Sequence, residues 1–171
     1  MQLLLSCIFA ILAFCVSFSA SAGDATVTWL HPDQYTDISA AEETQQSFSE
    51  NLFADLDHYF AELANKLPPR YHWNVTVTDV KLAGEVIASF KSGQKIRVIK
   101  PLYPPAIQFE YQLLDPQNKL VSQGKVDLRD MNFMFGPDLM VTRETQSFPY
   151  EKSMIKQWFK EQQQNKVFPK N

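Results

Sequence analysis

Residues 48–79 decide the fold and read FSENLFADLDHYFAELANKLPPRYHWNVTVTD. Apolar side chains recur every three or four residues from Phe48 to Leu67, the spacing that gives a helix one continuous apolar face. Pro68 and the proline after it should end this helix, because proline lacks the amide that the next turn needs. Residues 73–77 then alternate apolar and polar, which is the period of a strand with one buried face. The stretch therefore predicts a long amphipathic helix followed closely by a strand.

Further strands and a second helix are predicted on both sides of this pair. Apolar alternation and turn residues place the strands at residues 26–30, 95–99, 106–114 and 120–128, and residues 86–90 fit either a short strand or an extended loop. Pro149 can open a helix because its fixed φ suits the first turn. The buried stripe of that helix is predicted to be Tyr150, Met154, Trp158 and Phe159.

The order strand, helix, several strands, helix predicts an α+β fold. We expect a two-layer sandwich, with an antiparallel-rich sheet of about four to five strands. The long helix of the N-terminal half and the C-terminal helix would both pack on one face of that sheet. The long helix could begin at Ser39 or at Ser47, since each is followed three residues later by a glutamate and so forms a capping box.

The first 22 residues are apolar and uncharged, and they end on Ala20-Ser21-Ala22. Signal peptidase accepts small side chains one and three residues before the cut, so residues 1–22 predict a cleavable signal peptide. An uncleaved anchor is the alternative, but about 16 apolar residues fall short of the roughly 20 that span a bilayer. We expect a periplasmic protein that begins at Gly23 and forms one globular domain over residues 23–171.

Removing 22 of the 171 residues leaves 149 and removes both cysteines, Cys7 and Cys15. Disulfides, a thiolate nucleophile and cysteine-based metal sites are therefore excluded from the processed chain. All 16 basic and 19 acidic residues remain, so the formal charge stays at −3. A weakly acidic domain has no overall electrostatic footprint for nucleic acid or anionic lipid. The C-terminal lysines, Lys152 among them, are expected on a solvated helix face.

Four segments resemble one known family. They are residues 29–38 (WLHPDQYTDI), 78–85 (TDVKLAGE), 128–133 (LRDMNF) and 150–159 (YEKSMIKQWF). In this order they are similar to a bacterial family of unknown function, number 3016 in the domain-of-unknown-function series. The second segment has Lys81 where the family usually has an acidic residue. The resemblance implies an exported protein of Gram-negative bacteria, and it carries over no catalytic residue because the family has no assigned activity.

Acid/base or metal chemistry would most readily use the loop after the first strand. His31 lies there with Asp33 and Asp37, and Asp79 and Asp130 could join them. Such residues suit a metal-dependent or acid/base hydrolase only if they converge in one concave site. The alternative is a turn whose carboxylates cap nearby amides. No metal motif, phosphate loop, nucleophile elbow or cofactor motif is present, so no metal and no cofactor is predicted.

A histidine and two acidic residues also share one face of the long helix. Asp55, His58 and Glu62 have the i−3 and i+4 spacing that could offer three metal ligands. They lie opposite the apolar stripe, however, where solvent is expected. We therefore predict a solvated face for these three side chains.

The segment Pro101–Pro105 is the best candidate recognition surface, because proline-rich chain is stiff and loses little entropy on docking. Its alternative is an edge or connector that cannot donate ladder hydrogen bonds. The candidate binding residues are Tyr35, Tyr103, Pro104, Pro105 and Arg129.

The interpretation favoured by the sequence is a non-catalytic binding or accessory module of the periplasm. Its partner would be a protein or peptide of the cell envelope, with no nucleic acid and no stable membrane insertion after signal cleavage. The hydrolase that uses the loop of His31, Asp33 and Asp37 remains one alternative. An envelope-assembly or inhibitor protein remains another, and an exposed apolar patch would be its sign.

Overall fold

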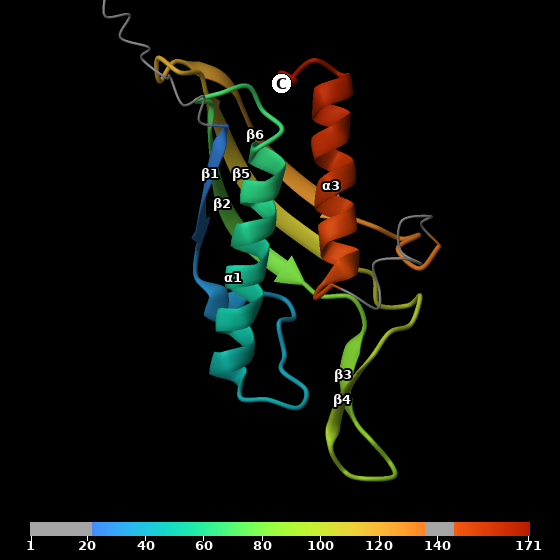
Figure 1. The fold of residues 1–171 in the computed structure, drawn as a ribbon. Helices are drawn as coiled ribbons and strands as arrows, with labels where there is room; N and C mark the ends of the chain where they lie inside the picture. Colours follow the sequence, from blue (N-terminus) through green and yellow to red (C-terminus); the bar gives the residue numbers. More distant parts are fainter. Residues whose placement is uncertain (1–21, 136–145) are drawn as a thin grey trace, which may run out of the picture.

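The computed structural model describes residues 22–135 and 146–171, so the predicted signal peptide lies outside the described residues except for Ala22. The first elements of the described residues are strand β1 (Asp24–Trp29), helix α1 (Gln45–Ala64) and strand β2 (His72–Lys81). β1 and β2 pair in parallel, with α1 as the crossover between them (Figure 1). A parallel pair needs such a crossover, because a tight turn can join only antiparallel strands.

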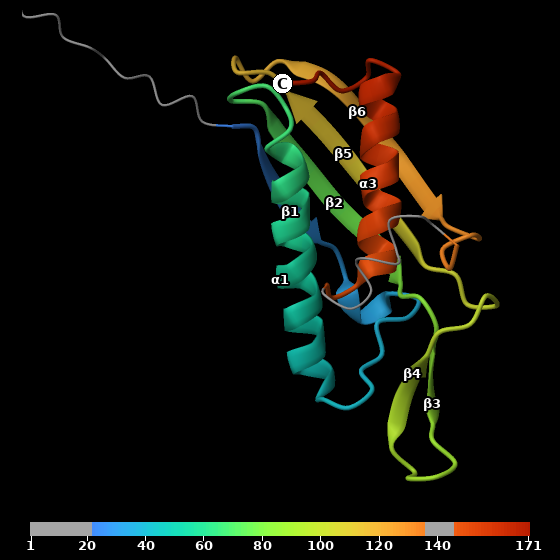
Figure 2. The same ribbon diagram turned by 45° about the vertical axis from the view of Figure 1, so that its right-hand side comes forward.

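Strands β5 (Ala106–Leu114) and β6 (Leu120–Arg129) complete the main sheet, whose order is β1-β2-β5-β6. Both new pairings are antiparallel. Helix α3 (Pro149–Gln164) lies beside α1 on the same face of the sheet (Figure 2). The predicted α+β class and two-layer arrangement are therefore confirmed, with four strands in the main sheet.

Strands β3 (Glu85–Ala88) and β4 (Lys95–Val98) form a separate antiparallel pair. This hairpin extends away from the sheet and the helices (Figures 1 and 2). It cannot pair with β2, because β1 and β5 already occupy both edges of that strand. We call residues 85–98 the arm, and residues 89–94 its tip.

The core fills the space between the helices and the sheet with aromatic rings. Trp73 on β2 is fully buried and packs at 5.3 Å from Phe60 of α1, measured between ring centroids. The ring also lies 6.0 Å from Trp158 and 5.4 Å from Phe159, both on α3. Phe168, beyond the end of α3, closes the cluster at 5.6 Å from Trp73. Large apolar rings of this kind dominate the free energy of core burial.

Helix α1 begins at a residue that neither capping box predicts. Its N-cap is Thr44, whose side chain accepts a hydrogen bond from the amide of Ser47 at 3.2 Å. Thr44 has an extended backbone, as an N-cap requires. Ser39 and Ser47 are therefore wrong as caps: Ser47 is the residue whose amide is capped, and Ser39 lies in the preceding loop.

Helix α3 buries two charged residues, one of which, Lys152, is predicted from the sequence to lie in solvent. Only 8% of Lys152 and 2% of Glu151 is exposed. The ammonium of Lys152 lies 2.6 Å from an Asp55 carboxylate oxygen and 5.6 Å from the centre of the Tyr59 ring. The prediction of a solvated lysine face is thus wrong for Lys152. Helix α1 supplies an anion and an aromatic face, and these offset the desolvation cost of burying the ammonium.

Candidate functional site

The chain that follows β1 runs back along the end of β2. The amide of Asp37 donates to the carbonyl of Val80 at 3.1 Å, and the amide of Leu82 donates to the carbonyl of Asp37 at 2.9 Å. Asp79 accepts hydrogen bonds from the amide and the hydroxyl of Thr36, each at 2.7 Å. These bonds hold the loop beside the point where the chain leaves the sheet.

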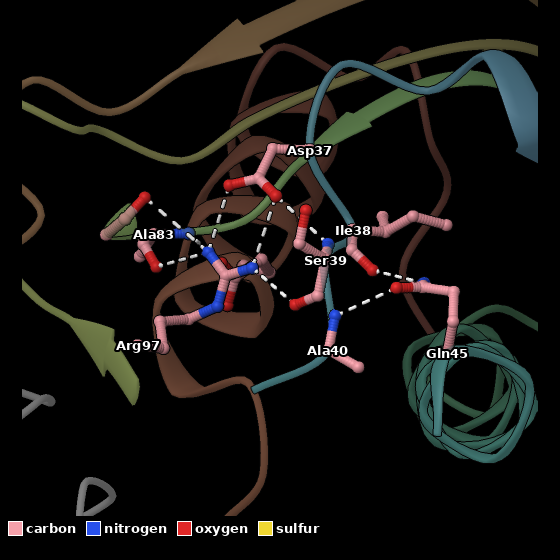
Figure 3. Close-up of polar contacts among 9 residues, drawn as sticks. Asp37, Ile38, Ser39, Ala40, Gln45, Ala83 and Arg97 are labelled. Carbon is pink, nitrogen blue, oxygen red and sulfur yellow. Dashed lines mark hydrogen bonds and ion pairs between the residues drawn. The ribbon is translucent and has the colours of Figure 1, made fainter. Parts of the chain in front are cut away.

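Arg97 of β4 binds this loop to the chain that leads from β2 into β3. Its Nη1 and Nη2 donate to the two carboxylate oxygens of Asp37 at 3.1 and 3.3 Å (Figure 3). Nη2 also donates to the carbonyl of Ser39 at 2.9 Å. Nη1 lies 3.3 Å from the carbonyl of Ala83 and 3.5 Å from that of Gly84. We call these five residues the Arg97 junction.

The loop side of the junction is tied to α1 by the first residue of that helix. The amide of Ala40 donates to the Gln45 side-chain oxygen at 2.9 Å. The Gln45 side-chain nitrogen donates in turn to the carbonyl of Ile38 at 2.7 Å (Figure 3). The arm, the loop and α1 are therefore joined through a continuous set of hydrogen bonds.

The ion pair in the junction is largely shielded from water, since 17% of the Arg97 side chain and 20% of the Asp37 side chain is exposed. Burial by itself raises the pKa of Asp37. The hydrogen bonds and charge of Arg97, together with hydrogen bonds from Ser39, outweigh burial and hold that pKa below its ordinary value. Asp37 therefore remains an anion paired with Arg97 at neutral pH.

Gly84 makes the turn from β2 into β3 possible. Its φ of +82° lies in the left-handed region that favours glycine. A Cβ at this position would lie 2.5 Å from the carbonyl oxygen of Val98, which is too close for any side chain. The position of the arm thus depends on a backbone contact that only glycine permits.

Glu151, at the start of α3, contacts the Arg97 junction through Ala83. Its carboxylate accepts a hydrogen bond from the amide of Ala83 at 2.7 Å. Burial raises the pKa of Glu151, and the Ala83 hydrogen bond and the charges of Arg97 and Lys152 lower it only in part. A buried carboxyl of this kind favours its protonated form more than a carboxyl in water does.

In the predicted hydrolase site, His31 does not line the cavity that Asp33 and Asp37 share. His31 has a left-handed backbone and an exposed side chain, and Asp33 is exposed in the short 3-10 helix η1 (Pro32–Gln34). Asp33 and Asp37 both line an open hollow of about 310 Å³, whose lining does not include His31. Within residues 22–135 and 146–171, no group of three or more His, Cys, Asp and Glu side chains could hold a metal ion.

The other two acidic candidates cap the backbone of their own surroundings. Asp79 is held by Thr36, as described above. Asp130 accepts a hydrogen bond from the amide of Asn132 at 2.9 Å, and its own amide donates to the carbonyl of Pro105 at 3.3 Å. His58, whose side chain is 77% exposed, is paired with Glu62 at 3.2 Å, on the solvent side of α1 as predicted. The solvated face is wrong for Asp55, whose side chain is 31% exposed because it pairs with the buried Lys152 of α3.

The candidate binding residues differ in accessibility. Tyr35 is buried and donates its hydroxyl hydrogen to the carbonyl of Val77 at 3.0 Å. Burial raises the pKa of Tyr35 to about 12. Pro104 and Pro105 are buried, Tyr103 is half-buried, and Arg129 is exposed. The Pro101–Pro105 segment is a connector between β4 and β5 rather than a strand.

The tip of the arm displays an aromatic side chain that the sequence analysis does not select. Phe90 is fully exposed. The half-buried Ile87 and Ile96 face each other across the two strands behind the tip. Leu102, on the connector after β4, is 75% exposed. Among the large apolar side chains of the described residues, Phe90 is the most exposed.

A family model described as "Protein of unknown function (DUF3016)" matches residues 23–161. The chain belongs to this family. The match covers both the arm and the Arg97 junction, and it begins where the predicted signal peptide ends. No curated protein and no solved structure matches the chain.

We predict that Arg97→Met lowers the free energy of unfolding by about 2–4 kcal/mol, because it leaves the Asp37 carboxylate and partly buried carbonyls without their donor. A double-mutant cycle with Asp37→Asn, measured by denaturant unfolding, should give a coupling energy above about 0.5 kcal/mol. The exposed Lys95→Met on the same strand is the control and should change stability by less than about 0.5 kcal/mol. Additive effects of the Arg97 and Asp37 substitutions would contradict the junction.

Glu151→Gln should stabilise the protein at neutral pH by on the order of 1 kcal/mol, while glutamine can still accept from Ala83. Folding raises the pKa of Glu151, so the unfolded chain loses this proton at a lower pH than the folded protein does. Glu151 therefore does not destabilise the protein below its ordinary pKa of 4.5, and it destabilises the protein increasingly as the pH rises above that value. Denaturant unfolding over a pH series should therefore show the gain shrinking in acid. An equal gain at every pH would contradict the buried carboxyl. Glu42→Gln, at an exposed position, is the control.

Proposed function

We propose that this protein is an exported binding module of the bacterial cell envelope, without catalytic activity of its own. Export is supported by the apolar first 22 residues and by the cleavage pattern Ala20-Ser21-Ala22. The fold is compatible with a cut after Ala22, since β1 begins at Asp24. The predicted signal peptide, together with the Gram-negative origin that the family resemblance implies, supports a periplasmic location.

The arm is the part of this module that we assign to partner binding. The single observation that carries the proposal is the full exposure of Phe90 at the tip of a hairpin whose base is fixed by Arg97. An isolated two-stranded hairpin is marginally stable in water, so the contacts of Arg97 at the base stabilise the arm and hold its tip in place. A binding site that is ordered in advance loses less entropy when its partner docks.

The junction itself is better suited to support than to catalysis. Asp37 accepts from Arg97 through both of its carboxylate oxygens, and Asp79 accepts from Thr36 through both of its own. Carboxylates that are engaged in this way orient backbone and cap amides. The same arm, with the exposed Phe90 at its tip, would also serve an envelope-assembly role.

A photo-crosslinking amino acid at position 90 tests the proposal in the native host. We expect a covalent adduct at that position after illumination, because Phe90 would lie against the partner. The matched control carries the same amino acid in place of Gln112, which is exposed on the polar face of the sheet opposite the helices. No adduct at position 90, or equal adducts at both positions, would contradict the proposed function. The intact mass of the purified chain reports whether it starts at Gly23.

A further inference from the structure

Charge is divided unevenly between the arm region and the rest of the molecule. The arm contains three basic side chains, Lys91, Lys95 and Arg97, and one acidic side chain, Glu85, which gives it a formal charge of +2. The remaining residues hold 13 basic and 18 acidic side chains, which gives them a formal charge of −5. The total of −3 therefore conceals a positive segment on a negative body.

The tip and the first residue of β4 together present an exposed aromatic ring and two cations. Phe90 is fully exposed and is followed directly by the exposed Lys91, and the exposed Lys95 begins β4. The turn between them is closed by a hydrogen bond from the amide of Ser89 to the carbonyl of Gln94 at 2.7 Å. Arg97 is engaged at the base by Asp37, so the charges offered by the tip are those of the two lysines.

We infer that the tip of the arm docks on an anionic lipid surface, with Phe90 in the headgroup region and Lys91 and Lys95 against lipid phosphates. This inference rests on the proposed export and on the proposed role of the arm. Phenylalanine is among the apolar side chains that surface-bound segments bury at the boundary of headgroups and acyl chains, and each lysine close to an anionic leaflet adds to the attraction. The docking is peripheral, since no helix among the described residues is long and apolar enough to cross a membrane.

The shape of the molecule makes this attraction possible in spite of its negative total charge. The arm extends beyond the sheet and the helices, so it can meet a surface before the body does (Figures 1 and 2). At physiological ionic strength, charges more than about 8 Å away are largely screened. An anionic surface that meets the tip first therefore interacts most strongly with the exposed Lys91 and Lys95, and the attraction or repulsion of more distant charges is weakened by screening.

Vesicle flotation tests the inference with the full chain as purified from its host. Phosphatidylcholine vesicles that contain phosphatidylglycerol should bind the protein at low salt, whereas vesicles of phosphatidylcholine alone should not. Lys91→Gln combined with Lys95→Gln should reduce the partition coefficient roughly 25-fold, at about fivefold for each lysine. Phe90→Ala should reduce it roughly tenfold, because the inserted ring is lost.

Matched controls carry the same chemical changes elsewhere. Lys160→Gln combined with Lys170→Gln removes two exposed charges from α3 and the C-terminus, and Phe135→Ala removes an aromatic side chain that is 79% exposed. Both controls should bind vesicles like the parent, with less than about a twofold change. All variants should keep the parent circular dichroism spectrum, because the substituted side chains are exposed.

The outcomes separate the lipid inference from the proposed function. Loss of vesicle binding in the arm variants alone supports both. A protein adduct at position 90 together with no binding to anionic vesicles overturns the lipid inference and leaves the binding arm in place. Vesicle binding that falls equally in arm and control variants overturns the lipid inference as well. If position 90 also forms no adduct in the host, the proposed function fails with it.

Discussion

The position of the arm depends on the guanidinium of Arg97. One planar group carries the donors that satisfy the Asp37 carboxylate and the carbonyls of Ser39, Ala83 and Gly84. Lysine could not replace it, since an ammonium has no fixed fork of donors. Through Asp37 and Gln45 the same group connects β4 to α1, and through Ala83 it meets Glu151 of α3. A hairpin that would be marginal alone thus becomes a fixed part of the molecule.

The parts of the fold that follow from periodicity could be predicted from the sequence. The stripe on α1 and the alternation in β2 and β5 depend on each segment's own residues, and these elements lie where they were expected. The separation of β3 and β4 from the main sheet could not be predicted, because it depends on which strands occupy the edges of β2. Thr44 was missed as the cap because two serine–glutamate pairs gave a stronger local signal.

The candidate site was only partly visible in the sequence. Asp37 was selected for its neighbours in the loop, yet its partner Arg97 lies 60 residues away along the chain. Glu151 and Lys152 read as surface charges on a helix, because their burial depends on what the other elements place above them. One signal was readable: residues 86–109 carry four basic and no acidic side chains. The exposure of Phe90 needed the structure, since a phenylalanine is by default a core residue.

A conventional two-layer core holds a small charged arm away from the body of the molecule, and Arg97 fixes this arm in one orientation. Both native cysteines precede Gly23, so spin labels on Ser92→Cys in the tip and Lys160→Cys on α3 would be the sole labels of the processed chain. Double electron–electron resonance should give one narrow distance distribution, which broadens when Arg97→Met is added. A broad distribution with Arg97 intact would contradict this fixed orientation.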